Sequence, residues 1–501
     1  MTTHSALLNQ VLKKEWGFKG AVISDWGGTH DTREAATKGL DLEMGTWGRS
    51  YDDDYLGKAF REGVRDGTYP AALLDDKVRR NLRMLFATGA VDGRRPGSIN
   101  TKAHMVTALR AAEEAVVLLK NEGALLPVDP AKVRTVAVIG QNAVRTFAAG
   151  VNSAGVKAFH ETTILEGIIA RAHGTMNVVF SEGYRQPVIR RVSEHDAAGV
   201  RKTEVVDATP EEAKDLSDRA VAAAKSADLV LLVCGLTHQP HNDDEGTDRE
   251  GLGLPAHQAE LIARVHGANP RTVVVLVDGS PVAMDPWVAQ VPAVVQAWYG
   301  GSEAGTALAA ALFGDVNPSG KLPVTFPRSL EQTPAFQGGP RAYPGLQGTV
   351  HYDEGLLVGY RWYDAKGIEP LFPFGFGLSY TTFAYKNLRV TPTGPATVSV
   401  ECDVTNAGDR AGAEVVQLYV EPPKASVPRP PRELKGFARV ELAPGETRTV
   451  RLELTPRSFA YYAVPEHSWS VEAGTYGIAV GSSSRDLRLR GSCPVAAGKA
   501  E

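Results

Sequence analysis

The sequence predicts a multidomain protein in which an α/β region is followed by a C-terminal antiparallel β-sandwich. Largely continuous apolar runs that alternate with helical patterns are typical of a parallel sheet covered on both faces. Apolar residues that alternate with polar or small ones are typical of strands buried on one face. Both patterns occur, in separate parts of a chain whose 501 residues suffice for about three domains.

The first region, residues 1–98, alternates short apolar runs with helical patterns. Residues 19–25 (Lys-Gly-Ala-Val-Ile-Ser-Asp) predict a strand that ends in polar residues, and residues 35–42 predict a helix that leads into a second short strand. Apolar residues spaced by three and four predict helices over 55–64 and 73–86.

The second region, residues 99–345, has a βα rhythm. Helical patterns separate or follow its four apolar runs, and the runs and helices are Val136–Ile139, Leu229–Val233, Thr272–Val277, Ala293–Ala297, 211–226, 256–266 and 303–313. This pattern predicts one mainly parallel sheet, in which the Val136 and Leu229 runs point the same way if they are neighbours.

A connecting segment, residues 346–387, leads to the third region, residues 388–495. Four runs in that region mostly alternate apolar with polar or small residues, with turn signals between them: 398–404, 415–420, 449–454 and 476–480. This is the pattern of a small antiparallel β-sandwich. We expect the tail after residue 495 to be frayed.

The composition excludes several functions. Lys and Arg number 54 against 58 Asp and Glu, so no basic field favours nucleic acid or an anionic membrane. No apolar run approaches the ~20 residues of a membrane-spanning helix, and the N-terminus shows no signal-peptide pattern. Three cysteines (Cys234, Cys402 and Cys493) cannot form a disulfide framework. A cytoplasmic location is therefore expected.

Asp25 is the first candidate for chemistry, because it ends an apolar strand in the motif Ser24-Asp25-Trp26. Catalytic groups of α/β folds lie at the C-terminal ends of parallel strands. Trp26 adds a flat apolar surface that suits the face of a sugar ring. The alternative is that Asp25 caps the helix that follows the strand.

The second candidate is an acidic loop directly after the Leu229 strand. Four carboxylates fall within six residues: Asp243, Asp244, Glu245 and Asp248. Crowding of like charges raises the pKa of at least one of them, as a general acid requires. Arg249 could keep Asp248 ionised, which would leave Glu245 as the protonated group.

Two other interpretations of this loop remain open. Its charges could form a solvated acidic surface, or His238, His241 and the aspartates could bind a metal ion. The histidines lack the fixed helical spacing of a known zinc motif.

Motifs along the whole chain, in order, resemble glycoside hydrolase family 3, in its β-glucosidase branch with a fibronectin type III-like C-terminal domain. The motifs that carry the resemblance are Glu15-Trp-Gly-Phe-Lys-Gly-Ala-Val-Ile-Ser-Asp-Trp, Gly39-Leu-Asp-Leu-Glu-Met, Val117-Leu-Leu-Lys-Asn, Glu245-Gly-Thr-Asp-Arg, Asn317-Pro-Ser-Gly-Lys-Leu-Pro, Tyr352-Asp-Glu-Gly, Phe374-Gly-Phe-Gly-Leu-Ser-Tyr and Pro430-Pro-Arg-Glu-Leu-Lys-Gly-Phe.

The resemblance implies a retaining glycoside hydrolase that acts on a β-glucoside or small oligosaccharide. Asp25 matches the nucleophile in the Ser-Asp-Trp form of the β-glucosidases, Glu245 matches the acid/base, and Trp26 is expected to line the sugar site. No metal and no cofactor are implied. Residues 99–345 correspond to the family's α/β-sandwich domain, and residues 388–495 to its fibronectin type III-like domain.

Residues 1–98 depart from the family pattern. The resemblance places the nucleophile late in a (β/α)₈ barrel of roughly 250 residues, yet 24 residues precede Asp25. These residues are therefore expected to be a barrel remnant of one or two βα units with an unpaired strand edge. That remnant should expose an apolar patch or be covered by a partner chain or oligomer. The alternative function is a truncated, catalytically impaired homologue that persists as a sugar-binding or structural remnant.

Overall fold

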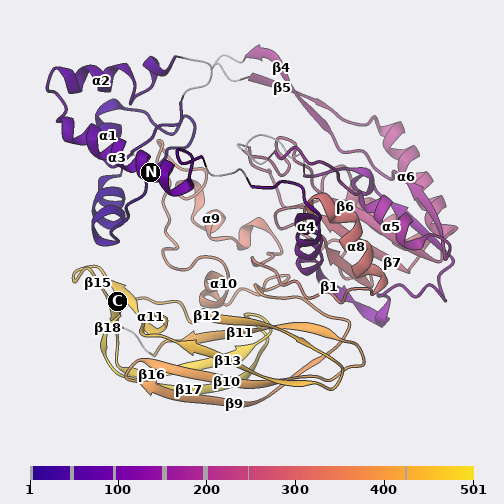
Figure 1. The fold of residues 1–501 in the computed structure, drawn as a ribbon. Helices are drawn as coiled ribbons and strands as arrows, with labels where there is room; N and C mark the ends of the chain where they lie inside the picture. Colours follow the sequence, from indigo (N-terminus) through magenta and orange to yellow (C-terminus); the bar gives the residue numbers. More distant parts are fainter. Residues whose placement is uncertain are drawn as a thin grey trace. The chain divides into compact units, whose positions relative to one another are not determined.

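The computed structural model describes residues 4–500 except 46–49, 94–96, 149–154, 196–200, 246 and 424–425. The chain divides into two compact units, Met1–Ile99 and Asn100–Glu501, and Figure 1 follows it from indigo to yellow. Among the helices of the described residues, none has both the length and the apolar character that crossing a membrane requires.

The first unit is mainly helical. Its helical elements are η1 (Ala6–Glu15), α1 (Thr32–Thr37), η2 (Tyr51–Asp53), α2 (Lys58–Arg65) and α3 (Ala71–Thr88). The helices predicted over 55–64 and 73–86 correspond to α2 and α3. The predicted strand over 19–25 is reduced to one parallel bridge between Ile23 and Leu42. A parallel strand is normally stabilised by neighbours along its length, and the described residues supply this one contact.

The second unit begins with α4 (Lys102–Ala115) and a six-stranded sheet in the order β1-β8-β7-β6-β2-β3. The strands are β1 (Val117–Asn121), β2 (Thr135–Ile139), β3 (Asn177–Ser181), β6 (Leu229–Gly235), β7 (Thr272–Val277) and β8 (Ala293–Gln296). Only β1 among them is antiparallel, to β8. Val136 pairs with Leu229 in parallel, which confirms the predicted mainly parallel sheet.

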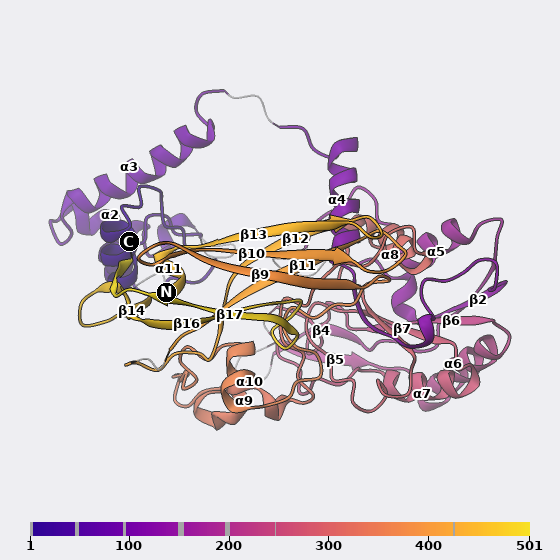
Figure 2. The same ribbon diagram turned by 90° about the horizontal axis from the view of Figure 1, so that it is seen from below.

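The apolar runs form strands whose two faces are both covered by helices (Figures 1 and 2). Successive residues of β6 enter opposite layers. Leu229, Leu231 and Val233 pack with α5 (Ile164–Ala172) and α8 (Ala304–Phe313). Val230, Leu232 and Cys234 pack with α6 (Pro210–Lys225) and α7 (Gln258–Ala268). Every residue of β6 is buried, so the strand had no polar face to reveal in its sequence.

The C-terminal part is an antiparallel β-sandwich, drawn in orange to yellow in Figure 1. One sheet has the order β13-β10-β9 and the other β12-β11-β16-β17. The strands are β9 (Phe383–Gly394), β10 (Thr397–Asn406), β11 (Gly412–Glu421), β12 (Glu433–Leu442), β13 (Thr447–Leu454), β16 (Gly474–Gly481) and β17 (Leu487–Val495). This confirms the predicted sandwich.

Two smaller sheets were not expected from the sequence. One is a hairpin of β4 (Val188–His195) and β5 (Arg201–Val206). The other joins β14 (Tyr461–Ala463), β15 (Ser468–Val471) and β18 (Gly498–Ala500). The expectation of a frayed tail is wrong, because β18 pairs with β15 from Gly498 to Ala500, which satisfies the backbone groups that face β15.

The segment between the α/β region and the sandwich carries α9 (Pro334–Gln337) and α10 (Tyr360–Lys366). Helix α10 packs on the sandwich. Its Tyr360 Oη accepts a hydrogen bond from the backbone N–H of Leu434 at 2.7 Å, and its Asp364 pairs with Arg432 at 3.1 Å and Arg485 at 3.0 Å.

A buried ion pair joins the α/β region to the sandwich. Lys321 Nζ lies 2.9 Å from Glu414 Oε1, and the two side chains are 13% and 5% exposed. Lys321 also donates a hydrogen bond to the Gly377 carbonyl at 2.8 Å. Breaking a buried pair from one side leaves an uncompensated charge in a poorly solvated place.

We expect Lys321→Met to lower the free energy of unfolding, measured by urea denaturation, by about 3–5 kcal/mol. Changing Glu414 to Leu as well should restore much of the loss, because no buried charge then remains. The matched control is Lys58→Met, whose pair with Glu62 has side chains 57% and 56% exposed. The control should cost less than about 1 kcal/mol, and equal losses in the two single variants would contradict the argument.

Candidate active site

Polar residues gather at one edge of the six-stranded sheet. Since β2, β3, β6, β7 and β8 are parallel, their carboxyl ends share that edge, where α/β sheets present functional groups. The loop 237–250 follows β6, the turn Asp278–Pro281 follows β7, and Tyr299 follows β8.

Asp243 is the best-connected side chain of this edge. Its carboxylate accepts hydrogen bonds from the Gly279 N–H at 2.7 Å, Ser280 Oγ at 2.7 Å and Tyr299 Oη at 2.8 Å. Tyr299 is held in turn by stacking against Phe147, and burial, followed by the charge of Asp243, raises the pKa of Tyr299 far above its ordinary value. Tyr299 therefore stays a neutral donor to Asp243.

Arg249 reaches the same turn from the other end of the loop. Its Nη2 donates to the Pro281 carbonyl at 2.7 Å and to Ser280 Oγ at 3.3 Å. Burial lowers the pKa of Arg249, while Asp243 and Asp278 oppose that shift, so the guanidinium remains charged. Asp248, for which the sequence suggested Arg249 as a partner, instead accepts a hydrogen bond from Tyr343 Oη at 2.5 Å.

Asp278 is a carboxylate of this sheet edge that the sequence pattern did not single out. It is fully buried and accepts a hydrogen bond from Gln296 Nε2 at 2.6 Å. Burial raises its pKa to about 7. The signal that marked Asp25, a carboxylate directly after an apolar strand, also marks Asp278 after β7 and would have found it.

Glu245 lies between Asp243 and Arg249 and is exposed. The metal interpretation of this loop gains no support from the residues described, which contain no group of three His, Cys, Asp or Glu side chains able to hold a metal ion. The His238 ring instead lies 4.2 Å from the Tyr299 ring, centroid to centroid. The loop is also more than a solvated acidic surface, because Asp243 and Arg249 anchor it.

Asp25 belongs to the first unit, where it is exposed. Its Oδ1 accepts a hydrogen bond from the Trp26 N–H at 2.8 Å. The helix-cap interpretation of Asp25 is wrong, because Asp31 caps α1 by accepting from the Glu34 N–H at 2.7 Å. Trp26 is 56% exposed, so its ring is available to a ligand.

A buried aspartate fixes the backbone that carries Asp25. Asp41 accepts hydrogen bonds from the Val22 N–H at 2.8 Å and from Lys13 Nζ at 2.6 Å. Ser24 accepts another from the Met44 N–H at 2.8 Å. These contacts hold the two segments of the Ile23–Leu42 bridge together, and so they position the backbone of Asp25.

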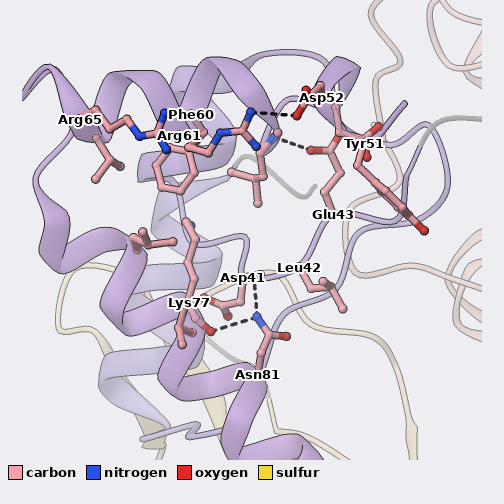
Figure 3. Close-up of a pocket in the computed structure, with 16 residues that line it drawn as sticks. Asp41, Leu42, Glu43, Tyr51, Asp52, Phe60, Arg61, Arg65, Lys77 and Asn81 are labelled. Carbon is pink, nitrogen blue, oxygen red and sulfur yellow. Dashed lines mark hydrogen bonds and ion pairs between the residues drawn. The ribbon is translucent and has the colours of Figure 1, made fainter. Parts of the chain in front are cut away.

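Figure 3 shows a pocket of about 580 Å³ beside Asp41. Lys77 lies in its wall and donates hydrogen bonds to the carbonyls of Ala35 and Leu40, and burial lowers its pKa to about 8. Asp25 is not among the residues that line this pocket. The candidate nucleophile therefore lies outside this pocket.

Helix α3 exposes an apolar stripe. An exposed apolar patch was one of the two outcomes expected for a barrel remnant, the other being cover by a partner chain. Its members lie at helical spacing and are all exposed: Leu74, Val78, Leu82, Leu85 and Phe86. Asp25 and Trp26 thus belong to the unit that carries this stripe, whereas Glu245 belongs to the unit with the parallel sheet.

Comparison with protein-family models gives two matches. The model of the glycosyl hydrolase family 3 C-terminal domain matches residues 116–380, and that of the fibronectin type III-like domain matches residues 414–484. The first match covers more than half of the chain.

Curated relatives are similar over nearly the whole chain. Beta-glucosidase BoGH3A of Bacteroides ovatus is 40% identical over 97% of this chain and 66% of its own length. Thermostable beta-glucosidase B of Acetivibrio thermocellus is 40% identical over 98% and 60%. An exo-alpha-(1->6)-L-arabinopyranosidase of Bifidobacterium longum is 37% identical over 97% and 60%. The chain thus spans 60–66% of the length of these relatives.

Solved structures show the same similarity. The GH3 beta-glucosidase of Bifidobacterium adolescentis aligns with a TM-score of 0.85 and 36% identity, over 99% of this chain and 68% of its own. DesR, a beta-glucosidase from Streptomyces venezuelae in complex with D-glucose, aligns with a TM-score of 0.87 and 31% identity, over 99% and 74%.

The raised pKa of Asp278 predicts a pH dependence of stability. Between the ordinary value near 3.8 and about 7, the folded chain keeps a proton that the unfolded chain has released. The free energy of unfolding should therefore fall as pH rises through this range. Urea denaturation at pH 5 and pH 7.5 measures it, and Asp278→Asn should weaken the fall by a few kcal/mol. The control is Asp409→Asn, at an exposed carboxylate of the same unit, which should leave the fall unchanged. Equal falls in wild type and Asp278→Asn would show that Asp278 is ionised throughout.

Proposed function

This chain belongs to glycosyl hydrolase family 3, and from that membership we propose that it is the larger part of a retaining β-glucosidase. The similarity over 97% of the chain to a protein named as a beta-glucosidase carries the proposal. The local setting of each candidate carboxylate supports it, because Asp25 and Glu245 are each exposed and each lies on anchored backbone within its own unit.

In the proposed reaction Asp25 is the nucleophile and Glu245 the acid/base. The Asp25 carboxylate attacks the anomeric carbon while Glu245 protonates the leaving oxygen, which gives a covalent glycosyl-enzyme and the free aglycone. Glu245 then takes a proton from water, and the resulting attack releases the sugar and regenerates Asp25. This mechanism requires the two carboxyl groups to approach to roughly 5–5.5 Å.

Trp26 is the proposed sugar contact, because its exposed ring follows directly on the nucleophile. The sugar specificity is less narrowly supported than the reaction. DesR is named with bound D-glucose, whereas two relatives are named as exo-alpha-(1->6)-L-arabinopyranosidases. We propose a terminal β-D-glucosyl residue, with an α-L-arabinopyranosyl residue as the competing substrate.

The remaining parts of the proposal concern the surroundings of the chain. The relatives are longer than this chain, and we propose that additional barrel segments, from the same or another polypeptide, pack on the apolar stripe of α3. Burial of such a stripe would stabilise the first unit by roughly 25 cal/mol per Å² of apolar surface. The location is proposed to be cytoplasmic, because all three cysteines are free and buried, as in reducing compartments.

Hydrolysis of 4-nitrophenyl β-D-glucoside and of the corresponding α-L-arabinopyranoside by the 501-residue chain tests the function. Asp25→Asn should abolish turnover, and Glu245→Gln should lower kcat/KM by ~10²–10⁴-fold. Azide identifies the roles: it should restore turnover of Asp25→Ala with an α-configured glycosyl azide and of Glu245→Ala with a β-configured one.

The outcomes separate the alternatives. Faster hydrolysis of the arabinopyranoside would overturn the assignment as a glucosidase, while the assignment as a retaining glycoside hydrolase would stand. Glucose binding without hydrolysis would favour the impaired, sugar-binding homologue. Full activity of both Asp25→Asn and Glu245→Gln would refute the assigned residues.

A further inference from the structure

The loop that carries Glu245 is tied at both ends to one short turn. Asp243 contacts Gly279 and Ser280, while Arg249 contacts Ser280 and Pro281. The turn itself continues β7, whose residues are all buried. The anchor is therefore a rigid part of the sheet edge.

The contact to Asp243 is specific in shape. Gly279 permits the close approach, because a Cβ at this position would lie 3.1 Å from Asp243 Oδ2 and 3.0 Å from Tyr299 Cε2. Tyr299 closes the other side with its hydroxyl hydrogen bond and is fixed by Phe147, with ring centroids 5.0 Å apart. Both carboxylate oxygens of Asp243 are thus used.

Charge complementarity strengthens the arrangement. The charges of Asp243 and Asp278 raise the pKa of Arg249 against the effect of burial, and a partly buried charge loses more from removal of a nearby opposite charge than an exposed one does. The loop is consequently held by hydrogen bonds and by charge at residues 243 and 249, which flank residue 245.

We propose that Asp243 and Arg249 are positioning residues that hold Glu245 in the place where it can exchange protons with the substrate and water. The inference rests on the proposed function, in which Glu245 is the acid/base. A general acid must remain within hydrogen-bond reach of the leaving oxygen, and a displacement of about 1 Å can cost ~10²-fold in rate. An exposed glutamate on an untied loop would not meet that requirement.

The test compares substrates that differ in their need for an acid. Asp243→Ala should lower kcat/KM for methyl β-glucoside by ~10–100-fold, because its leaving group must be protonated. For 2,4-dinitrophenyl β-glucoside, whose leaving group departs unprotonated, the loss of kcat/KM should be only a few-fold. Azide should raise kcat of Asp243→Ala on the second substrate, as it does when the base is displaced. Asp243→Asn, which keeps one acceptor oxygen, should lie between wild type and Asp243→Ala.

The matched control is Glu250→Gln, an exposed acidic residue of the same loop, which should leave both substrates unaffected. Equal losses on both substrates in Asp243→Ala would overturn the positioning role and indicate general damage. Unchanged kinetics in Asp243→Ala and Arg249→Met would overturn it as well.

Hydrogen exchange tests the positioning role independently of activity. Asp243→Ala should speed exchange of the amides of residues 238–249 by more than about 10-fold, with exchange in β6 and the sandwich unchanged. If the wild-type chain hydrolyses neither substrate, the proposed function fails for this chain. The anchoring of the loop is then judged by exchange alone, and unchanged exchange refutes it.

Discussion

The parallel pairing of β2, β6, β7 and β8 is the constraint on which the candidate site of the second unit depends. When helices cover both faces of a parallel sheet, the loops that connect strands and helices lie at the two ends of the strands. The segments after β6, β7 and β8 therefore meet, although they are far apart in the sequence. Asp243, Asp278 and Tyr299 come together as a consequence of topology.

At this edge of the sheet, Asp243 and Asp278 are poorly solvated. The cost of burying them is reduced in a different way for each carboxylate. Asp243 receives three hydrogen bonds and the nearby positive charge of Arg249. Asp278 lies deeper, and its pKa rises to about 7 with burial as the first cause. One cation thus balances one carboxylate, while the second carboxylate retains its proton through much of the acidic range, which limits the cost of burying charge.

The sequence predicted the central strands and the sandwich because their patterns follow directly from burial. β6 reads as a continuous apolar run and is buried at every residue. Among the strands that were not predicted, β3 is partly exposed along its length and β18 has three residues, whereas β1 begins with three buried residues and gave no such reason. The strand expected over 19–25 needed neighbours that the local sequence does not encode, and it formed one bridge.

The candidate carboxylates were found by position, but their environment could not be foreseen. Asp25 and Asp278 both follow apolar runs, and in the sequence only the Ser24-Asp25-Trp26 motif, with the family resemblance it carries, sets Asp25 apart. The structure separates them by burial, since Asp25 is exposed and Asp278 is fully enclosed. Arg249 likewise faces the turn after β7 and not its sequence neighbour, because the partner is set by the fold of the sheet edge.

Both units contain a pair of carboxylates, one exposed and one that anchors the backbone. In each, a less exposed carboxylate that accepts hydrogen bonds holds the segment of an exposed one: Asp41 holds the segment of Asp25, and Asp243 holds the loop of Glu245. A carboxylate with several donors contributes structure, because its oxygens are engaged in those hydrogen bonds. These contacts also fix the backbone of the exposed carboxylate in the same segment. The acidic residues that stabilise these two segments therefore fix the backbone from which the exposed carboxylates project.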